Sequence, residues 1–269
     1  MSNKSKVILI TGTSTGIGKA SAEYLVQQGH TIFGTSRFPG SYQKPKNYTI
    51  LQMDVTEFES IQAGINHIIE YKGRIDVLIN NAGFGIAGAI EHTSISKAKE
   101  QFETNFFGTV RLIKSVLPIM HKQDSGLIIN ISSIGGLMGL PYQGMYSASK
   151  FAIEGLTESL YKELHSTKIN ITLIEPGDFK TSFTKKREIP KNANQSDTFQ
   201  NTLNIIENDE KSGQEPKLIG KLLNRIINKP NPCLRYTVGA FDQKLAVFLK
   251  RILPNRLFDW IIIKHYKIV

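Results

Sequence analysis

The feature that most constrains the fold of this chain is a glycine-rich turn between an apolar run and a helical stretch. Residues 6–11 (KVILIT) are apolar and β-branched, which is typical of a strand buried on both faces of a sheet. Glycines follow at positions 12, 16 and 18, and residues 19–29 then have helical apolar spacing. This order predicts a dinucleotide site, because glycines let the backbone approach a pyrophosphate and free helix N–H groups point at it. The spacing Gly-x3-Gly-x-Gly differs from the commoner Gly-x-Gly-x-x-Gly.

The end of the second predicted strand, residues 30–35, determines which nicotinamide cofactor we expect. An acidic residue at this point usually binds the ribose 2′-hydroxyl of NAD. Here the strand is followed by Ser36 and Arg37, with no acid. The planar fork of an arginine pairs well with a phosphate, and Lys19 on the first helix adds positive charge nearby. The alternative is that Arg37 is a solvated loop charge; we predict NADP(H).

Tyr146, Lys150 and Ser133 form a second group of candidate functional residues. Residues 146–162 have helical apolar spacing, so Tyr146 and Lys150, four positions apart, share one helix face. A phenol has a pKa of about 10 in water, and a neighbouring ammonium lowers it towards neutral pH. Ser133, thirteen residues before the tyrosine, offers a hydroxyl to a carbonyl oxygen. Alone, the Tyr–Lys pair would be an ordinary surface contact, but beside a predicted nucleotide turn it indicates proton transfer.

With these motifs and several others in the same order, the chain resembles the short-chain dehydrogenase/reductase family over residues 7–181. The matching segments are TGTSTGIG at 11–18, Asp54-Val55, Asn80-Asn81-Ala82-Gly83, Asn105 within NFFG, Ser133, Tyr146 with Lys150, and Pro176-Gly177 with Thr181. The resemblance implies an α/β fold, a single doubly wound parallel sheet (Rossmann fold) with a C-terminal helical extension. It also implies an NADP(H)-dependent oxidoreductase that transfers hydride between nicotinamide and a carbonyl or alcohol.

The resemblance assigns roles to the matching residues. Tyr146 would be the general acid in carbonyl reduction and the base in alcohol oxidation, and Ser133 would orient the substrate oxygen. Lys150 would contact the nicotinamide ribose and lower the tyrosine pKa, while Asn105 would hold a water linking Lys150 to solvent. No metal is expected. The residues implied at the cofactor are Gly12, Ser14, Thr15, Gly16, Ile17, Gly18, Arg37, Asp54, Val55, Asn81, Ala82, Gly83, Tyr146, Lys150, Pro176, Gly177 and Thr181.

Length and composition limit the remaining possibilities. The 269 residues alternate helical and β-branched runs without a linker, so we expect one domain over residues 1–269, with a variable lid and helical extension at 178–269. The N-terminal apolar run is too short for a secretory signal, no stretch reaches the ~20 residues of a membrane span, and the lone Cys233 fits a reducing cytoplasm. No basic stripe with stacking aromatics is apparent, so nucleic acid is not an expected partner.

The net charge of +10 is concentrated near the C-terminus, with +2 on residues 1–180 and +8 on residues 181–269. Residues 178–213 are polar, and in the family this segment folds over the substrate. Amphipathic helices are predicted at 216–227 and 239–253, followed by an apolar group at 257–263. The helices either pack on the core or a subunit interface, lie on a membrane through residues 239–269, or guide a lipophilic substrate. We favour packing.

The neighbours of the predicted catalytic residues are mostly apolar, which favours a lipophilic carbonyl or alcohol. No arginine is apparent that would bind a substrate carboxylate. Within the family, the chain looks most like members acting on steroids, retinoids or fatty aldehydes, and subunit pairing into a homodimer or homotetramer is implied through residues 98–120 and 146–165. Alternative functions are a non-catalytic NADP(H) sensor and a peripheral membrane protein. The residues expected at the substrate are Ser133, Tyr146, Phe84, Gly135, Phe179 and Phe183.

Overall fold

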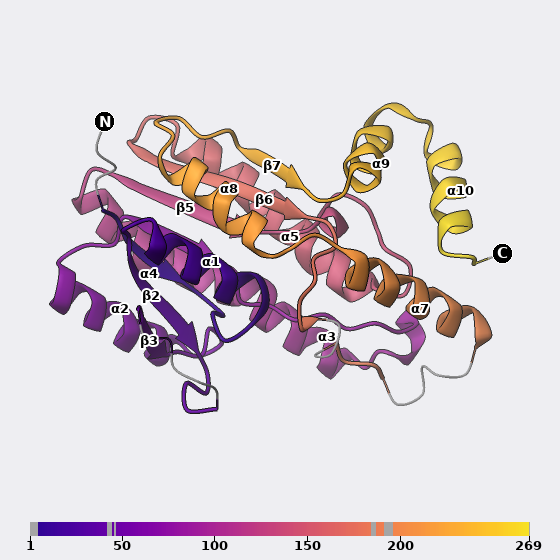
Figure 1. Ribbon diagram of the computed structural model, residues 1–269, viewed down its shortest axis with the longest axis horizontal. Coiled ribbons are helices and arrows are strands. Elements are labelled where there is room, and N and C mark those ends of the chain that lie inside the picture. The colour runs from indigo at the N-terminus through magenta and orange to yellow at the C-terminus, as the bar shows by residue number, and fades with distance from the viewer. Residues whose placement is uncertain (1–4, 42–44, 46, 184–186, 191–195, 269) are drawn as a thin grey trace.

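The computed structural model describes residues 5–41, 45, 47–183, 187–190 and 196–268. Within these residues, seven parallel strands form one sheet in the order β3-β2-β1-β4-β5-β6-β7. The strand order reverses between β1 and β4, so the crossovers on the two sides of β1 run in opposite directions. The predicted doubly wound α/β sheet is therefore confirmed (Figure 1). The strands are β1 (Val7–Ile10), β2 (Thr31–Ser36), β3 (Thr49–Gln52), β4 (Val77–Asn80), β5 (Gly126–Ile131), β6 (Ile169–Pro176) and β7 (Arg235–Val238).

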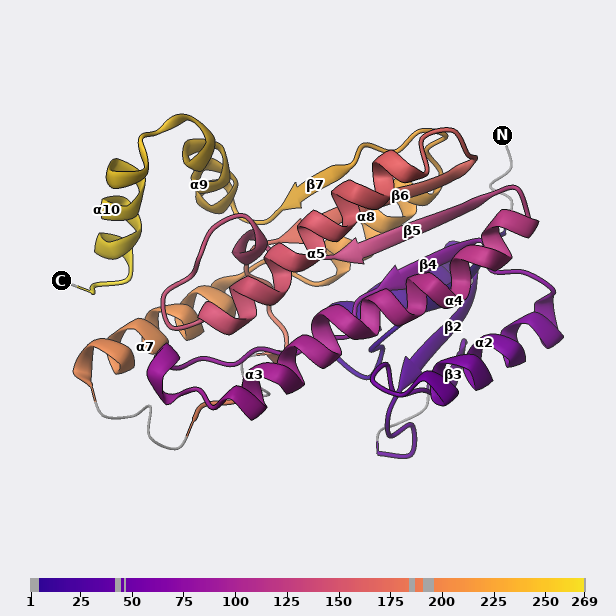
Figure 2. The ribbon, with the colours of Figure 1, turned by 180° about the vertical axis from the view of Figure 1, so that it is seen from behind.

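Both faces of the sheet are covered by helices. In β1, Val7 and Leu9 pack in one cluster with α2 (Phe58–Lys72), α4 (Gly108–Lys122) and α5 (Gly144–Glu163). Ile8 and Ile10 pack in the other with α1 (Gly16–Gln27) and α8 (Lys217–Ile227). Figures 1 and 2 show these two helical layers from opposite sides. Burial on both faces explains why the strand is a continuous apolar run and does not alternate.

The helix expected near residues 98–120 is longer and contains an irregular turn. It consists of α3 (Ile95–Phe102), a π-helical turn at Glu103–Phe107 and α4, and the predicted site residue Asn105 lies in the π turn. A π turn inside an α-helix often marks a functional position, because it changes the direction of the side chains that follow. Short 3-10 helices at Ile90–His92 and Ile134–Gly136 complete this part of the chain.

The segment expected to be a polar lid contains a packed helix, α7 (Asp197–Ser212). Ser196 caps it by accepting a hydrogen bond from the Phe199 N–H, and Phe199, Leu203 and Ile206 are buried along one face. The many polar residues of this segment form the other face, so this part of the expected lid is an amphipathic helix. Residues 184–186 and 191–195 of the predicted lid lie outside the described residues.

The C-terminal extension packs unevenly. α8 buries Ile219, Leu223 and Ile226 against α1 and the sheet, as predicted. In contrast, α9 (Phe241–Ile252) and α10 (Asn255–His265) contact the body mainly through Val247 and Phe258, and they project from it in both views. The favoured alternative for residues 239–253, packing on the core or at a subunit interface, is met in part: Val247 and Leu249 join a cluster with Met138 of the body. Phe241, Phe248 and Ile252 stay exposed in the single chain, and a subunit interface stays a prediction. In the described part of the chain, no helix has the length and hydropathy needed to cross a bilayer.

Candidate active site

The glycine turn after β1 has the geometry of an anion cradle. Gly12 and Gly16 have φ values of +70° and +60°, which side chains with a Cβ rarely adopt. A Cβ on Gly18 would clash with the Gly12 carbonyl oxygen, and one on Gly16 would lie 3.4 Å from Thr181. The first turn of α1 carries no acidic residue. The helix N-terminus and the close backbone approach therefore fit the pyrophosphate of a dinucleotide.

The residues after β4 hold this turn in place. Asn81 Nδ2 donates hydrogen bonds to the backbone oxygens of Thr11 (2.9 Å) and Gly12 (3.2 Å). In return, the Thr11 hydroxyl accepts from the N–H groups of Asn81 and Ala82, at 2.9 and 3.0 Å. The two neighbouring strands β1 and β4 are thus tied together at their carboxyl ends, where a doubly wound sheet binds its ligand.

A single cavity of about 1090 Å³ brings most of the predicted residues together. It extends from the end of β2 past the glycine turn and the end of β4 to Tyr146 and on to the C-terminal extension. Three predicted residues do not line it. Gly18 lies behind the turn, Asn105 lies behind Phe84, and a Cβ on Gly135 would be 3.3 Å from the Tyr146 ring. The predicted residues that do line it are Gly12, Ser14, Thr15, Gly16, Ile17, Arg37, Asp54, Val55, Asn81, Ala82, Gly83, Phe84, Ser133, Tyr146, Lys150, Pro176, Gly177, Phe179, Thr181 and Phe183.

Arg37 follows the carboxyl end of β2, where proteins of this fold bind the 2′-hydroxyl or 2′-phosphate of the adenosine ribose. It is exposed, its guanidinium is 5.8 Å from the Phe38 ring centre, and it forms no ion pair with any described residue. Ser36 and Ser41 line the cavity beside it. The nearby Asp54 accepts hydrogen bonds from the backbone N–H and hydroxyl of Thr56, at 2.9 and 2.8 Å. The guanidinium donors of Arg37 are therefore available to a phosphate.

Ser133, Tyr146 and Lys150 converge at the middle of the cavity. Ser133 follows β5 and accepts a hydrogen bond from the Gly135 N–H at 3.0 Å, while Tyr146 and Lys150 lie on the first turns of α5. The Lys150 Nζ donates to the Ile131 carbonyl oxygen at 2.8 Å and is 5.9 Å from the centre of the Tyr146 ring. The predicted triplet is thus assembled from the segment after β5 and the first turns of α5, which pack against each other.

Burial dominates the electrostatics of this triplet. It raises the pKa of Tyr146 to about 12, although hydrogen bonding with Ser133 works in the opposite direction. Burial also lowers the pKa of Lys150 to about 8, against the effect of Glu154 one helical turn further on. The expected lowering of the tyrosine pKa by Lys150 stays a prediction. The groups that lower it are Ser133 and Arg187, while Lys150 is hydrogen-bonded to Ile131.

The side chain of Asn105 connects two parts of the site. Its Nδ2 donates to the Phe84 carbonyl oxygen (3.0 Å) and to the Ser149 hydroxyl (3.1 Å), and its Oδ1 accepts from the Phe84 N–H (3.0 Å). Ser149 in turn donates to the Tyr146 carbonyl oxygen at 2.7 Å. The amide therefore holds the loop after β4 against α5. The water relay expected of Asn105 stays a prediction.

The substrate side of the cavity is only partly apolar. The Phe183 ring packs edge-on against Tyr146, with centres 5.8 Å apart, and Phe179 is buried in the cluster beneath. Sequence reasoning missed Arg187, whose guanidinium lies 6.0 Å from the Phe183 ring and pairs with Glu210. It also missed Asp178, Asp209, Glu210 and Tyr266, which line the cavity. The position of Asp178 directly after Pro176-Gly177 was the one available signal, because Asp209 and Glu210 lie on α7 and Tyr266 follows α10, all far along the chain.

The C-terminal extension is tied to this wall by specific contacts. Gln243 of α9 accepts from the Asp178 N–H at 3.1 Å and donates from Nε2 to the Asp178 carboxylate. The Thr202 hydroxyl on α7 donates to the Tyr266 carbonyl oxygen at 3.1 Å, which ties the chain after α10 to α7. Residues more than sixty positions apart therefore form one wall.

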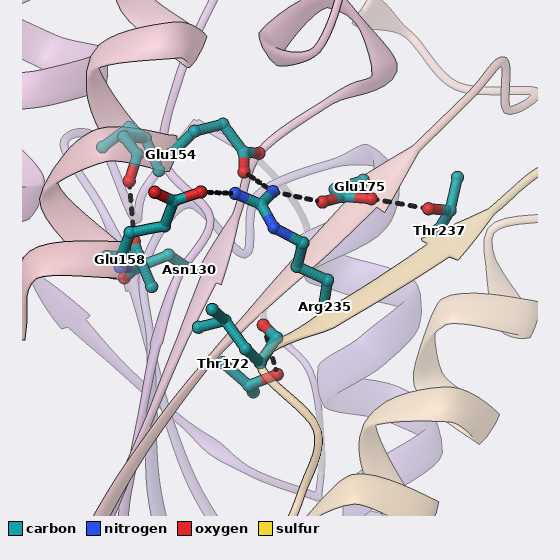
Figure 3. Close-up of polar contacts among 10 residues, drawn as sticks. Asn130, Glu154, Glu158, Thr172, Glu175, Arg235 and Thr237 are labelled. Carbon is teal, nitrogen blue, oxygen red and sulfur yellow. Dashed lines mark hydrogen bonds and ion pairs between the residues drawn. The ribbon is translucent and has the colours of Figure 1, made fainter. Parts of the chain in front are cut away.

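A charged network supports α5 from behind. Arg235 of β7 pairs with Glu154 and Glu158 of α5 and with Glu175 of β6, the last at 2.7 Å (Figure 3). Thr237 donates to the second oxygen of Glu175 at 2.6 Å. Because Glu154 follows Lys150 by one turn, the network fixes the helix that carries the Tyr–Lys pair against the last two strands.

The chain combines a doubly wound sheet and a glycine cradle with a Ser–Tyr–Lys group in the same cavity. This combination is typical of oxidoreductases that bind a nicotinamide cofactor. The family model for short chain dehydrogenases matches residues 6–192. The chain therefore belongs to the short-chain dehydrogenase/reductase family, as the sequence motifs indicated.

Two curated relatives are similar over most of their length. The chain is 44% identical over 267 residues to the 3-ketodihydrosphingosine reductase of Bacteroides thetaiotaomicron, with 98% of both chains covered. It is 35% identical over 257 residues to retinol dehydrogenase 8 of Bos taurus, covering 87% of this chain and 82% of that one.

Two solved structures match in fold as well. A short-chain dehydrogenase from Streptomyces avermitilis has a TM-score of 0.80 and 30% identity, with 98% of both chains covered. The structure of ElxO with NADP bound has a TM-score of 0.70 and 30% identity, covering 87% of this chain and 97% of that one. Structural neighbours in the family thus bind nicotinamide cofactors.

Proposed function

We propose that this protein reduces a lipophilic ketone of the 3-ketodihydrosphingosine type with NADPH. The observation that carries the proposal is the single cavity that joins the glycine turn and Arg37 to Ser133, Tyr146 and Phe183. A cofactor bound along the strand ends and a ketone bound against Tyr146 would meet there. The proposed substrate is supported by the name of the Bacteroides relative, which is similar from end to end.

The residues of the site suit a reduction. When bound, the nicotinamide supplies a hydride to the carbonyl carbon of the substrate. Ser133 donates a hydrogen bond to the carbonyl oxygen, and that oxygen takes the Tyr146 hydroxyl proton as its negative charge develops. A phenol with a pKa of about 12 is protonated at neutral pH and is ready to donate. Burial disfavours the phenolate, so the raised pKa supports Tyr146 as the proton donor proposed here.

The cofactor preference is tested by titrating the protein with NADPH and with NADH, following nicotinamide fluorescence. Replacing Arg37 by Ala should weaken NADPH binding by about 10- to 100-fold and leave NADH nearly unchanged, because charge-assisted hydrogen bonds to a phosphate contribute about 1.5–3 kcal/mol. Lys122→Ala removes the same charge from the distant end of α4 and serves as the control. Equal affinities that Arg37→Ala does not change would overturn the NADP(H) assignment.

Catalysis itself is tested with Tyr146→Phe. Loss of the hydroxyl should reduce turnover of ketones at least ~100-fold, since general acid catalysis contributes about that much or more. NADPH binding should remain, because the ring still fills its place against Phe183. Turnover that survives in this variant would refute the role of Tyr146. If wild type and variant both bind NADPH and neither turns over any ketone, the non-catalytic sensor becomes the better assignment.

A second role, contact with a membrane surface, is favoured by the exposed faces of α9 and α10. Phe241, Phe248, Ile252 and Trp260 are between 56% and 77% exposed. Lys264 lies 5.1 Å from the Trp260 ring, and residues 239–269 hold six Lys and Arg against two Asp and Glu. Aromatic and aliphatic side chains beside lysines bind the interface of an anionic bilayer, which would also hold the proposed lipid substrate.

The membrane role is tested by sedimentation with vesicles of phosphatidylglycerol and phosphatidylcholine and with vesicles of phosphatidylcholine alone. We expect binding to the anionic vesicles only, and loss of binding in the double variant Phe248→Ser, Trp260→Ser. Both side chains are exposed, so the fold should persist. Phe58→Ser, Tyr71→Ser is the matched control, because these exposed aromatics lie on α2, away from the extension. Equal loss in both double variants, or no binding by wild type, would refute the role.

A further inference from the structure

The end of the cavity beyond Tyr146 is acidic, although the chain as a whole is basic. Asp178, which follows β6, and Asp209 and Glu210 of α7 line this end together with Tyr266. The protein carries a formal net charge of +10, so three carboxylates at one wall of the substrate cavity are not a consequence of overall composition. None of the residues proposed above for proton or hydride transfer requires them.

The three carboxylates differ in their partners. Glu210 pairs with Arg187, and Asp209 lies 3.3 Å from the His265 ring nitrogen. Among the described residues Asp178 forms no ion pair, and its carboxylate accepts only from the neutral amide of Gln243; the charge of Arg187 lowers its pKa only in small part. Burial, with Glu210 and Asp209 adding to it, raises the pKa of Asp178 to about 7. A carboxylate in such a place is costly unless a cation completes its surroundings.

A second, independent observation also indicates that a ligand completes this wall. Arg187 is 8% exposed, and its Nε and Nη1 have no hydrogen-bond partner among the described residues. Its remaining nitrogen, Nη2, pairs with Glu210, and the guanidinium lies 6.0 Å from the centre of the Phe183 ring. Arg187 does not itself line the cavity but lies directly behind these two residues, which do. Buried guanidinium donors without acceptors are rare, and the group they lack is an acceptor oxygen.

We infer that this end of the cavity binds the head group of an amino alcohol, with the protonated amine at Asp178 and a hydroxyl oxygen directed towards Arg187, which lies behind Phe183 and Glu210. The inference rests on the proposed function and specifies its substrate as an α-amino ketone, because the carbonyl must lie against Ser133 and Tyr146. Gln243 orients the Asp178 carboxylate, and Asp209 and Glu210 add negative potential behind it. The wall is complementary to a single positive charge placed next to the reacting carbon.

The test uses soluble ten-carbon probes in the presence of NADP⁺, so that binding is measured independently of turnover. The amine probe is 2-aminodecane-1,3-diol, and the neutral probes are its N-acetyl derivative and decane-1,3-diol. Titration calorimetry should show that wild type binds the amine about 10- to 100-fold more tightly than either neutral probe, as expected for a charge-assisted hydrogen bond. Asp178→Asn should remove this preference by weakening the binding of the amine probe while leaving the binding of the neutral probes unchanged.

Two variants sharpen the comparison. Asp242→Asn removes the same charge from the exposed first turn of α9, next to Gln243 and outside the cavity, and should keep the full preference for the amine. Arg187→Met should abolish the difference between the amino diol and 2-aminodecan-3-ol, which lacks the terminal hydroxyl. The inference is overturned if wild type binds charged and neutral probes equally, or if Asp178→Asn weakens all probes alike.

Failure of the inference and failure of the proposed function give different results. If wild type reduces decan-3-one with NADPH but shows no preference for the amine probe, the proposed reductase activity is supported and the head-group site is refuted. If wild type binds the amino diol selectively and Asp178→Asn abolishes this preference, while no ketone is reduced, the head-group site is supported and the reductase activity is refuted. Reduction of the matching 2-amino-1-hydroxy ketone, with a raised KM and a nearly unchanged kcat in Asp178→Asn, would support both.

Discussion

Replacing Asp178 by Asn should make the protein more stable in the absence of substrate. The folded structure raises the pKa of this carboxyl from 3.8 to about 7 through burial and the nearby Glu210 and Asp209. Three pKa units at about 1.4 kcal/mol each give an upper limit of about 4 kcal/mol. Because solvent still reaches part of the side chain, we expect about 2 kcal/mol at pH 8. Asn keeps the shape and an oxygen that accepts from Gln243.

The pH dependence of this gain follows from which state holds more protons. Between pH 4 and 7 the folded state keeps the Asp178 proton while the unfolded state has lost it, so wild type loses stability as the pH rises. Asn has no such titration. The advantage of the variant should therefore be absent at pH 4, about a third of its full size at pH 5, and complete above pH 7.

Thermal unfolding at pH 5, 6, 7 and 8, followed by circular dichroism without cofactor, measures the effect. At pH 8 the Tm of Asp178→Asn should exceed that of wild type by about 4–8 °C, from the size scaling for chains of this length. Asp242→Asn, at an exposed position, should stay close to wild type throughout. A gain of equal size at every pH, or a loss at pH 8, would show that the carboxylate is not strained by its surroundings and would refute the reasoning.

Three further predictions concern the core, the turn and the lysine. Arg235→Met leaves Glu154 and Glu175 buried without their cation, so it should lower the free energy of unfolding, measured in urea, by about 3–5 kcal/mol. Lys168→Met, at an exposed ion pair, should lower it by at most about 1 kcal/mol. Similar losses in the two variants would contradict this prediction. Gly18→Ala places a Cβ 2.5 Å from Asn81 Nδ2 and should weaken NADPH binding about tenfold or more. Gly155→Ala, with open space around the added Cβ, should leave NADPH binding unchanged. Unchanged NADPH binding in the Gly18 variant would argue against a pyrophosphate site at the glycine turn. Because burial lowers the pKa of Lys150 to about 8, its charge is present below that pH and lost above it, so kcat/KM for reduction should fall as the pH rises through 8; a profile that stays flat to pH 9.5 would exclude a role for that charge.

The part of the site expected to bind the cofactor was predictable because the sequence motifs that indicate it are local. A strand, a glycine turn and a helix are consecutive in the sequence, and Tyr146 and Lys150 are one helical turn apart. Their convergence with Ser133 then follows from the packing of α5 against the short 3-10 helix that Ser133 begins. The roles of these residues and the preference for NADP(H) stay predictions, since they depend on a bound cofactor and substrate.

The acidic wall was not predictable for the opposite reason. Asp178, Glu210 and Tyr266 are separated by tens of residues and meet only because α7 and the chain after α10 fold back over the strand ends. Amphipathic spacing located α8 and α9, but it could not tell that α8 would bury its apolar face while α9 leaves Phe248 exposed. That difference depends on which surface each helix reaches, and spacing contains no such information.

The link between Gln243 and Asp178 has a consequence for how substrate choice and membrane contact can change. One side of α9 orients a carboxylate in the cavity, and the other side presents the exposed Phe241 and Phe248. Deleting the chain after residue 240 would therefore remove the exposed aromatic surface and disturb the cavity in one step, so truncation cannot separate the proposed membrane contact from substrate binding. Substitutions on the exposed side alone can. Under the two proposals, exchanging this short segment in evolution would alter membrane contact and substrate choice together.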